Sequence, residues 1–162
     1  MEVGGAAVRK RAYFDSYWGD GWPDLNWLEP YFLAPAGKRW SFETGNDGGS
    51  LTLEGVDGTN QLSAGEGRID LYLTMIGNPE YGVLLHYLKL GGRENYYSRG
   101  DLNRLYERVE TLHGDPMPVG LHIPFDDAWA AVKEFVQGDG ALPRGIAWIS
   151  SGELPKNVFP GQ

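Results

Sequence analysis

Alternating apolar and polar residues predict an antiparallel hairpin near the middle of the chain. Between residues 69 and 76 an apolar side chain occupies every second position, the pattern of a strand with one buried face. Residues 77–80 have the composition of a turn, and residues 83–88 form an apolar run typical of a buried strand. The two runs predict a pair of strands, and residues 94–98 predict a third beyond the Gly-Gly turn at 91–92.

A helical period follows over residues 125–137. Asp126 and Asp127 lie in its first turn, where the helix dipole favours negative charge, and the Gly-Asp-Gly that starts at Gly138 ends it. The apolar face of this predicted helix consists of Phe125, Trp129, Val132 and Val136, with Ala128 and Phe135 beside them. A break rich in glycine and proline leads to a predicted closing strand at 145–149.

The remaining segments have weaker patterns. Residues 25–35 have the spacing of a short helix, and residues 50–54 that of a small strand. Residues 102–112 fit a helix and a strand, since their apolar positions satisfy both periods. Together these elements predict one α+β domain over residues 1–162, a mainly antiparallel sheet with one or two helices packed on one face.

Composition narrows the class of partner. The chain has 162 residues, of which 41% are hydrophobic, and a formal net charge of −8. Such acidity argues against nucleic acid and anionic membrane surfaces as partners, and it suits docking on a basic protein. There is no cysteine, no apolar stretch after the basic residues 9–11 that would make a signal peptide, and no run long enough to span a bilayer. We therefore expect a cytoplasmic protein.

Residues with catalytic chemistry form no recognisable motif. His86, His113 and His122 are scattered, and none belongs to a metal-binding spacing. His86 and His122 lie in apolar strands, where we expect hydrogen-bonded structural histidines. Asp126 and Asp127 are better explained by the helix dipole than as paired catalytic carboxylates. The sequence predicts no enzyme, no cofactor and no metal site.

Two motifs resemble a known family. One is the aromatic-Ser-basic-Gly turn in Tyr-Tyr-Ser-Arg-Gly-Asp at 96–101, and the other is the helix, break and strand at the C-terminal end. The matching residues of the second motif are Ala128, Ala131 or Val132, Phe135, Pro143 and Trp148. With the strands between them, the motifs span residues 69–149 and resemble the deaminase-associated immunity proteins of bacterial polymorphic toxin systems, the first family of such immunity proteins. The first 50 residues match less well, and Pro124 replaces the usual serine or threonine cap. The resemblance favours a strand at 102–112.

This resemblance implies a protein that binds a cognate toxin domain, typically a nucleic-acid deaminase, and blocks its substrate site. Such a toxin needs a basic groove, which an acidic protein can occupy. We predict contacts near the turn at 98–101, through the carboxylates of Glu94, Asp101 and Glu107 and with Tyr96 as an aromatic anchor. The sequence specifies neither the toxin nor the oligomeric state.

The Arg-Gly-Asp within this turn has the letters of an adhesion motif. A chain without an export signal has no use for one, so we interpret these residues as a turn. The turn interpretation predicts Gly100 at a positive φ, which glycine adopts without strain.

Aromatic residues near the N-terminus support an alternative function. Trp18, Trp22 and Trp40 lie in stretches rich in glycine and proline, and if exposed they would suit a glycan-binding or protein-binding surface, or less readily a small hydrolase. Trp129 and Trp148 are predicted to lie in the core, facing one another across the contact of helix and sheet.

Overall fold

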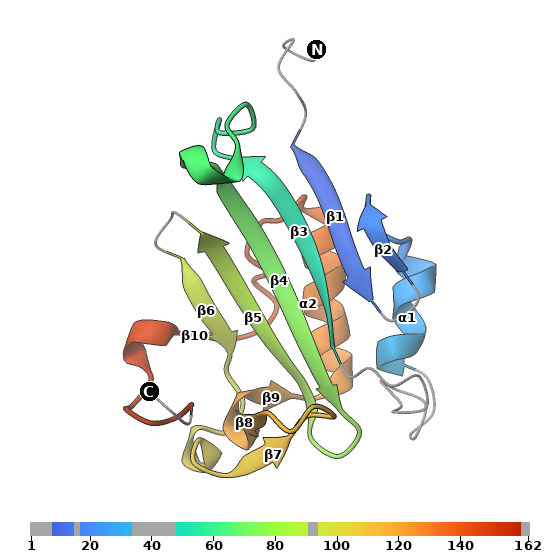
Figure 1. The fold of residues 1–162 in the computed structure, drawn as a ribbon. Coiled ribbons are helices and arrows are strands. Elements are labelled where there is room, and N and C mark those ends of the chain that lie inside the picture. Colours follow the sequence, from blue (N-terminus) through green and yellow to red (C-terminus); the bar gives the residue numbers. More distant parts are fainter. Residues whose placement is uncertain (1–7, 15–16, 34–47, 91–93, 160–162) are drawn as a thin grey trace.

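The computed structural model describes residues 8–14, 17–33, 48–90 and 94–159. In these ranges an eight-stranded sheet forms the centre of the molecule, its paired strands are antiparallel, and two helices lie on one of its faces (Figure 1). The strand order is β10-β6-β5-β4-β3-β1-β2, with β9 paired to β5, while β7 and β8 form a separate ribbon. The elements are β1 (Arg9–Phe14), β2 (Tyr17–Asp20), α1 (Leu25–Leu33), β3 (Gly48–Val56), β4 (Ile69–Asn78), β5 (Gly82–Leu90), β6 (Asn95–Ser98), β7 (Arg108–Glu110), β8 (Pro116–Pro118), β9 (His122–Ile123), α2 (Phe125–Gln137) and β10 (Trp148–Ser150). The predicted α+β fold is confirmed.

The predicted hairpin is the pair β4 and β5. Leu73 and Met75 of β4 and Leu85 of β5 are fully buried on the side of the helices, while the residues between them point to the other face. This follows from the period of two in a strand, which sends alternate side chains to opposite faces. The alternation read from the sequence therefore sets which face of the sheet carries the core.

Helix α2 covers the middle of the sheet with the apolar face that the sequence predicts. Its buried residues are Phe125, Ala128, Trp129, Ala131, Val132 and Phe135. Pro124 precedes the helix and makes no capping hydrogen bond, because a proline side chain has no acceptor atom. Gly138 caps the other end. Gly140 has φ +95° and its N–H donates to the carbonyl of Phe135 over 2.9 Å, which satisfies a carbonyl of the last turn. Burial of an aromatic side chain of this helix, such as that of Phe135, contributes about 1.5–3 kcal/mol to the stability of the fold.

Two tryptophans fill different parts of this core. Trp129 stacks on Phe32 of α1, with ring centroids 5.3 Å apart, and so joins the two helices. Trp148 packs edge-on against Tyr87 of the sheet, and its indole N–H donates to the carbonyl of Pro143 over 2.7 Å. Both residues contribute to the core as predicted, but each packs against its own partner rather than facing the other.

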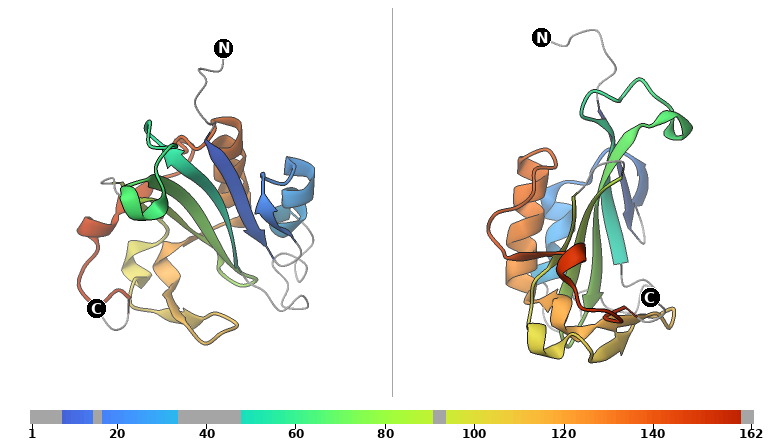
Figure 2. Two further views of the ribbon diagram at one scale, coloured as in Figure 1. Left: turned by 45° about the horizontal axis from the view of Figure 1, so that its top comes forward. Right: turned by 90° about the vertical axis from the view of Figure 1, so that its left-hand side faces the viewer.

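A second, smaller layer lies on the opposite face of the sheet, at one end (Figure 2). Its buried residues are Leu84, Leu105, Leu121, Ile149 and Val158. Residues 102–104 form a single 3₁₀ turn, and the strand β7 begins only at Arg108. Both alternatives for 102–112 are therefore partly right, because a helical turn places Leu105 in this layer before the chain becomes extended. Residues 151–159 complete the layer, and Phe159 packs on Tyr97 with ring centroids 5.1 Å apart.

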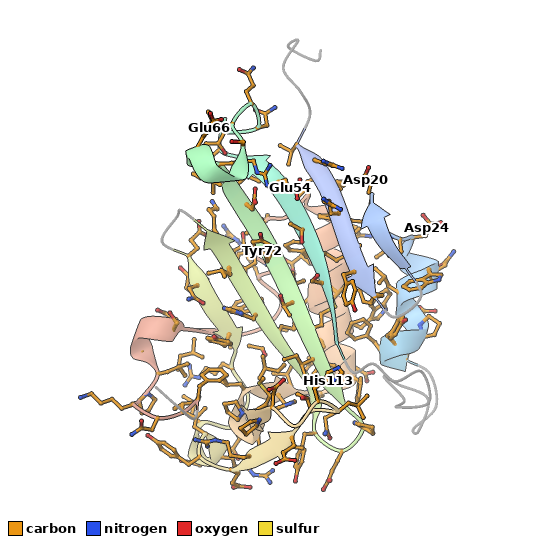
Figure 3. The ribbon with its side chains drawn as sticks, viewed as in Figure 1. Asp20, Asp24, Glu54, Glu66, Tyr72 and His113 are labelled. Carbon is orange, nitrogen blue, oxygen red and sulfur yellow. The ribbon has the colours of Figure 1, made fainter. Side chains whose placement is uncertain are left out.

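Among the described residues no α-helix packs on the rest of that face, and we call it the open face. Its side chains come from β1, β3, β4, β5 and β6 and point toward the viewer in Figure 3, where Glu54 and Tyr72 are labelled. Neither described helix is both long and apolar enough to cross a bilayer.

Candidate functional site

The histidines either have structural hydrogen-bond partners or lie exposed. His122 is 6% exposed, and its Nδ1–H donates to the carbonyl of Pro118 over 2.9 Å. His86 is half-buried, and its Nε2 lies 2.6 Å from Oδ1 of Asn95. His113 is exposed in the β7–β8 turn (Figure 3). The structural roles predicted for His86 and His122 are confirmed, and in the described ranges no group of three or more histidine or acidic side chains is placed to hold a metal ion.

Protonation of these histidines makes stability depend on pH. Burial lowers the pKa of both His86 and His122, against smaller opposing effects of their hydrogen bonds. The unfolded chain therefore takes up protons below about pH 6.5 while the folded chain does not, so stability is lost as pH falls through this range. We expect the midpoint of urea unfolding to be lower at about pH 5.5 than at about pH 7.5. The variant His86→Gln should show a smaller difference, and a midpoint that rises on acidification would contradict the assignment.

The motif at 96–101 holds segments of the fold together. Ser98 is fully buried; its hydroxyl donates to the carbonyl of Leu121 over 2.7 Å and accepts the N–H of Leu85 over 2.9 Å. The prediction of a positive φ at Gly100 is wrong, since its φ lies outside the left-handed region. Gly100 is needed for space instead, because an added Cβ would overlap the carbonyl of His122. The motif is a close crossing of three segments.

The structure separates two of the predicted contact residues. Glu94 precedes β6 and forms an ion pair with Lys89, with Oε2 and Nζ 3.0 Å apart. Asp101 follows β6 at its other end and accepts the N–H of Asn103 over 3.0 Å, which caps the next turn. The two carboxylates are thus at opposite ends of one strand and do not form one patch.

The other two predicted contact residues also differ in position. Tyr96 is half-buried and packs against the main core beside Tyr87, with ring centroids 6.4 Å apart. Glu107 is exposed and pairs with Arg104 over 2.8 Å, and this guanidinium lowers the pKa of Glu107. Glu107 therefore lies near Asp101, whereas Tyr96 faces the side of the helices.

Carboxylates outnumber cations at the end of the molecule formed by the β4–β5 turn, the start of α2 and the β7–β8 ribbon (Figure 1). Segments 78–82, 99–118 and 122–129 contain seven carboxylates, all exposed, together with three arginines and no lysine. We call this region the acidic end, and its carboxylates are Glu80, Asp101, Glu107, Glu110, Asp115, Asp126 and Asp127. Two of the four predicted contact residues belong to it.

A hollow of about 370 Å³ lies on the acidic end, between the β4–β5 turn and the first turn of α2. It is lined by Pro79, Glu80, Tyr81, Gly82, Pro124, Phe125 and Asp126. The guanidinium carbon of Arg104 lies 5.4 Å from the ring centroid of Tyr81, so the hollow borders the segment that carries Asp101 and Glu107. The sequence analysis did not single out Glu80 and assigned Asp126 only to the helix dipole, because only the fold brings the turn and the distant helix start together.

The upper part of the open face carries a balanced network of charges. Its members are the guanidinium groups of Arg9, Arg11 and Arg68 and the carboxylates of Asp20, Glu54 and Asp70. The shortest pairs are Arg9 with Asp20, at 2.8 Å, and Arg68 with Asp70, at 2.9 Å. Asp70 is 7% exposed and also accepts the N–H of Gly55, so this end of the network is anchored in the sheet. Three positive and three negative groups leave the network without net charge.

The tryptophans of the alternative function do not make an exposed platform in the described ranges. Trp22 is half-buried, stacks against Phe135 with centroids 5.3 Å apart, and donates its indole N–H to the carbonyl of Thr52 over 3.1 Å. Trp22 therefore packs against the core, and the condition of exposure on which the alternative function depends is not met at this residue. The side chain of Trp18 and the whole of Trp40 lie outside the described residues.

Comparison with known protein families gives one result. A family model described as "Immunity protein Imm1" matches residues 36–150, a range that begins before β3 and reaches the end of β10. No curated protein and no solved structure matches the chain. The matched range includes both motifs on which the resemblance to immunity proteins rests, and that resemblance is confirmed at the level of the family.

Proposed function

Because the chain belongs to the Imm1 family of immunity proteins, we propose that it protects the cell that makes it by binding a cognate toxin domain and blocking that domain's substrate site. The observation that carries this proposal is the family match over residues 36–150. The resemblance to deaminase-associated immunity proteins favours a toxin that deaminates nucleic acids or nucleotides. The protein acts by occupying a site, with no chemistry of its own.

The distribution of charge supports docking through the acidic end. A toxin that acts on nucleic acid needs a basic surface around its pocket to hold the phosphates. The acidic end offers seven exposed carboxylates to such a surface. Their attraction for the basic surface speeds association of the two proteins, and once bound they exclude the nucleic-acid substrate, which is also negatively charged. Asp101 and Glu107 keep their proposed contact role here, and Glu80 and Asp126 join them. Glu94 and Tyr96 remain predicted contacts outside this region.

Co-expression with the toxin domain encoded beside the gene tests the function. We expect cells that make the toxin to survive when they also make this protein, and the two proteins to co-purify as a stable complex. A catalytically dead toxin variant should co-purify equally well, because the proposed binding needs no reaction. Cell death without a complex, although the protein is folded by circular dichroism, would refute the immunity function for that toxin.

A further inference from the structure

A hollow of about 250 Å³ lies on the open face, where β1, β2, β3 and β4 run side by side (Figure 1), and we call it the sheet hollow. Cross-strand pairing places Arg11 beside Thr52 and Thr52 beside Tyr72, so one row of side chains crosses three strands at this point. The neighbouring row contributes Tyr13 and Ser50. The full lining is Arg11, Ala12, Tyr13, Gly19, Ser50, Thr52, Glu54 and Tyr72. The fold thus gathers hydroxyl groups, a guanidinium group and a carboxylate around one small space.

The guanidinium group of Arg11 keeps its hydrogen-bonding capacity, whereas the other two arginines of the network are engaged. Arg9 donates twice to Asp20, over 2.8 and 3.2 Å. Arg68 donates twice to Asp70, over 2.9 and 3.0 Å. Arg11 comes no closer than 3.7 Å to a carboxylate of the network, which is beyond hydrogen-bond length. Its guanidinium group makes no hydrogen bond with a residue that the structure describes, so its five N–H donors are left for a ligand or for water.

The carboxylate and the hydroxyl groups of the sheet hollow also have unused hydrogen-bonding capacity. The carboxylate of Glu54 lies between 3.7 and 4.0 Å from three guanidinium groups and accepts no hydrogen bond from a described residue. The hydroxyl groups of Ser50, Thr52 and Tyr72 likewise make none within the described part of the chain. The buried hydroxyl of Ser98, by contrast, both donates and accepts within the protein. Because protein polar groups away from water normally find partners, this concentration of unpaired groups suits a polar ligand.

The chemistry of the lining favours an uncharged ligand that carries several hydroxyl groups. An anion would meet the three carboxylates of the network, and a cation would meet its three guanidinium groups. A hydroxyl group, however, accepts from a guanidinium and donates to a carboxylate, and hydrogen bonds to charged partners are the stronger kind. Adjacent hydroxyl groups on one ligand therefore match Arg11 and Glu54, whose charged groups lie 3.7 Å apart. Tyr13, which is 58% exposed, adds an aromatic face that attracts C–H groups.

We propose that the sheet hollow binds one uncharged sugar ring. Arg11 donates to two adjacent hydroxyl groups of the ring, Glu54 accepts from one of them, and Tyr13 packs against the C–H groups of its face. Pockets for drug-sized ligands measure about 300–1,000 Å³. The sheet hollow, at about 250 Å³, is smaller and suits a single ring. It shares no residue with the acidic end, so this inference goes beyond toxin binding.

NMR titration of the isotopically labelled full chain tests the site. The probes are the methyl glycosides of glucose, galactose, mannose and N-acetylglucosamine. We expect at least one of them to saturate with a dissociation constant of about 1–30 mM, as suits a shallow site with few contacts, and to shift the amide signals of the lining residues. Because the ligand is uncharged, the constant should change less than about twofold between about 0.05 and about 0.5 M salt. The proposal is overturned if no glycoside saturates, or if acetate or glycine shifts the same signals at lower concentration than any glycoside.

Substitutions in the lining assign the roles. Arg11→Met removes the guanidinium donors but keeps an unbranched side chain, and it should raise the dissociation constant for the sugar at least about tenfold. Tyr13→Ala removes the aromatic face and should raise it several-fold, whereas Tyr13→Phe keeps the ring and should bind as the unmodified chain does. The matched control is Arg144→Met, which removes the same charge at an exposed position beside α2, and it should leave sugar binding unchanged.

The outcomes separate sugar binding from toxin binding. If Arg11→Met and Tyr13→Ala, folded by circular dichroism, bind the sugar as the unmodified chain does, the sugar lies elsewhere and the proposal fails. If Arg11→Met loses protection against the toxin while the unmodified chain binds no sugar, the sheet hollow belongs to the toxin and the proposal is also overturned. Loss of sugar binding in Arg11→Met with full protection against the toxin is the expected result.

Discussion

Gly100→Ala is expected to destabilise the protein by about 3 kcal/mol or more, a large share of the stability of a typical domain. A Cβ at this position would overlap the carbonyl oxygen of His122 and lie 2.6 Å from that of Gly120. Both obstacles are backbone atoms, so no side chain can rotate away. The crossing is also fixed from the other side, because Ser98 bonds to the carbonyl of Leu121. Urea unfolding followed by circular dichroism measures the loss.

The control for this substitution is Gly65→Ala. Gly65 lies in an exposed turn, and an added Cβ would find no atom within 4 Å. Its free energy of unfolding should stay within about 0.5 kcal/mol of that of the unmodified chain, as is usual for surface positions. Equal free energies of unfolding for Gly100→Ala and Gly65→Ala would contradict this prediction, because they would mean that a Cβ at position 100 causes no costly overlap with the carbonyl oxygens of the crossing segment.

Local patterns predicted the elements whose residues repeat a period over a full strand or helix. The apolar alternation of residues 69–76 and the helical period of residues 125–137 each specify one buried face, so β4 and α2 were found with nearly correct ends. The segment 102–112 is too short for either period to dominate. Its outcome depends on Leu105, which a single helical turn carries into the small layer. Only the tertiary contact decides between the two patterns.

Features that depend on contacts between distant segments escaped the sequence. Gly100 was correctly singled out, but for a turn rather than for its close approach to His122, which comes 22 residues later in the chain. Trp22 was a candidate for exposure because of its glycine-rich and proline-rich surroundings, yet its ring packs against that of Phe135. The open face was missed as well, because Tyr13 and Ser50 become neighbours only when β1 pairs with β3.

The predicted contact residues show the same difference between what a local pattern predicts and what the fold decides. The sequence identified Asp101 and Glu107 from their distance to the motif at 96–101, and the fold places both on the acidic end. Glu94 is equally close in sequence, but β6 carries it to the opposite end, where Lys89 neutralises it. Closeness in sequence is therefore a poor guide to a shared surface once an extended strand lies between two residues.

Reversal of Glu80 and Asp126 together, to lysine, is expected to weaken toxin affinity by more than about tenfold. Both carboxylates are exposed and line the hollow of the acidic end, so the change turns attraction for a basic toxin into repulsion. Much of the loss should appear as a slower association rate that depends less steeply on salt. Surface plasmon resonance on an inactive toxin variant measures both rates. The complex would have to form through another surface if neither rate changed.

Reversal of Glu94 and Asp101 together should also weaken binding by more than about tenfold, and single variants divide the effect. Asp101→Lys should account for most of it, since Asp101 lies on the acidic end, while Glu94→Lys removes a carboxylate that Lys89 already pairs with at 3.0 Å. The matched control is Glu29→Lys, the same charge change at an exposed position of α1. If Glu29→Lys weakened binding as much as Asp101→Lys, overall charge rather than the acidic end would govern recognition. If Glu94→Lys alone produced the loss, the toxin would bind the opposite end of β6, and the acidic end would be excluded.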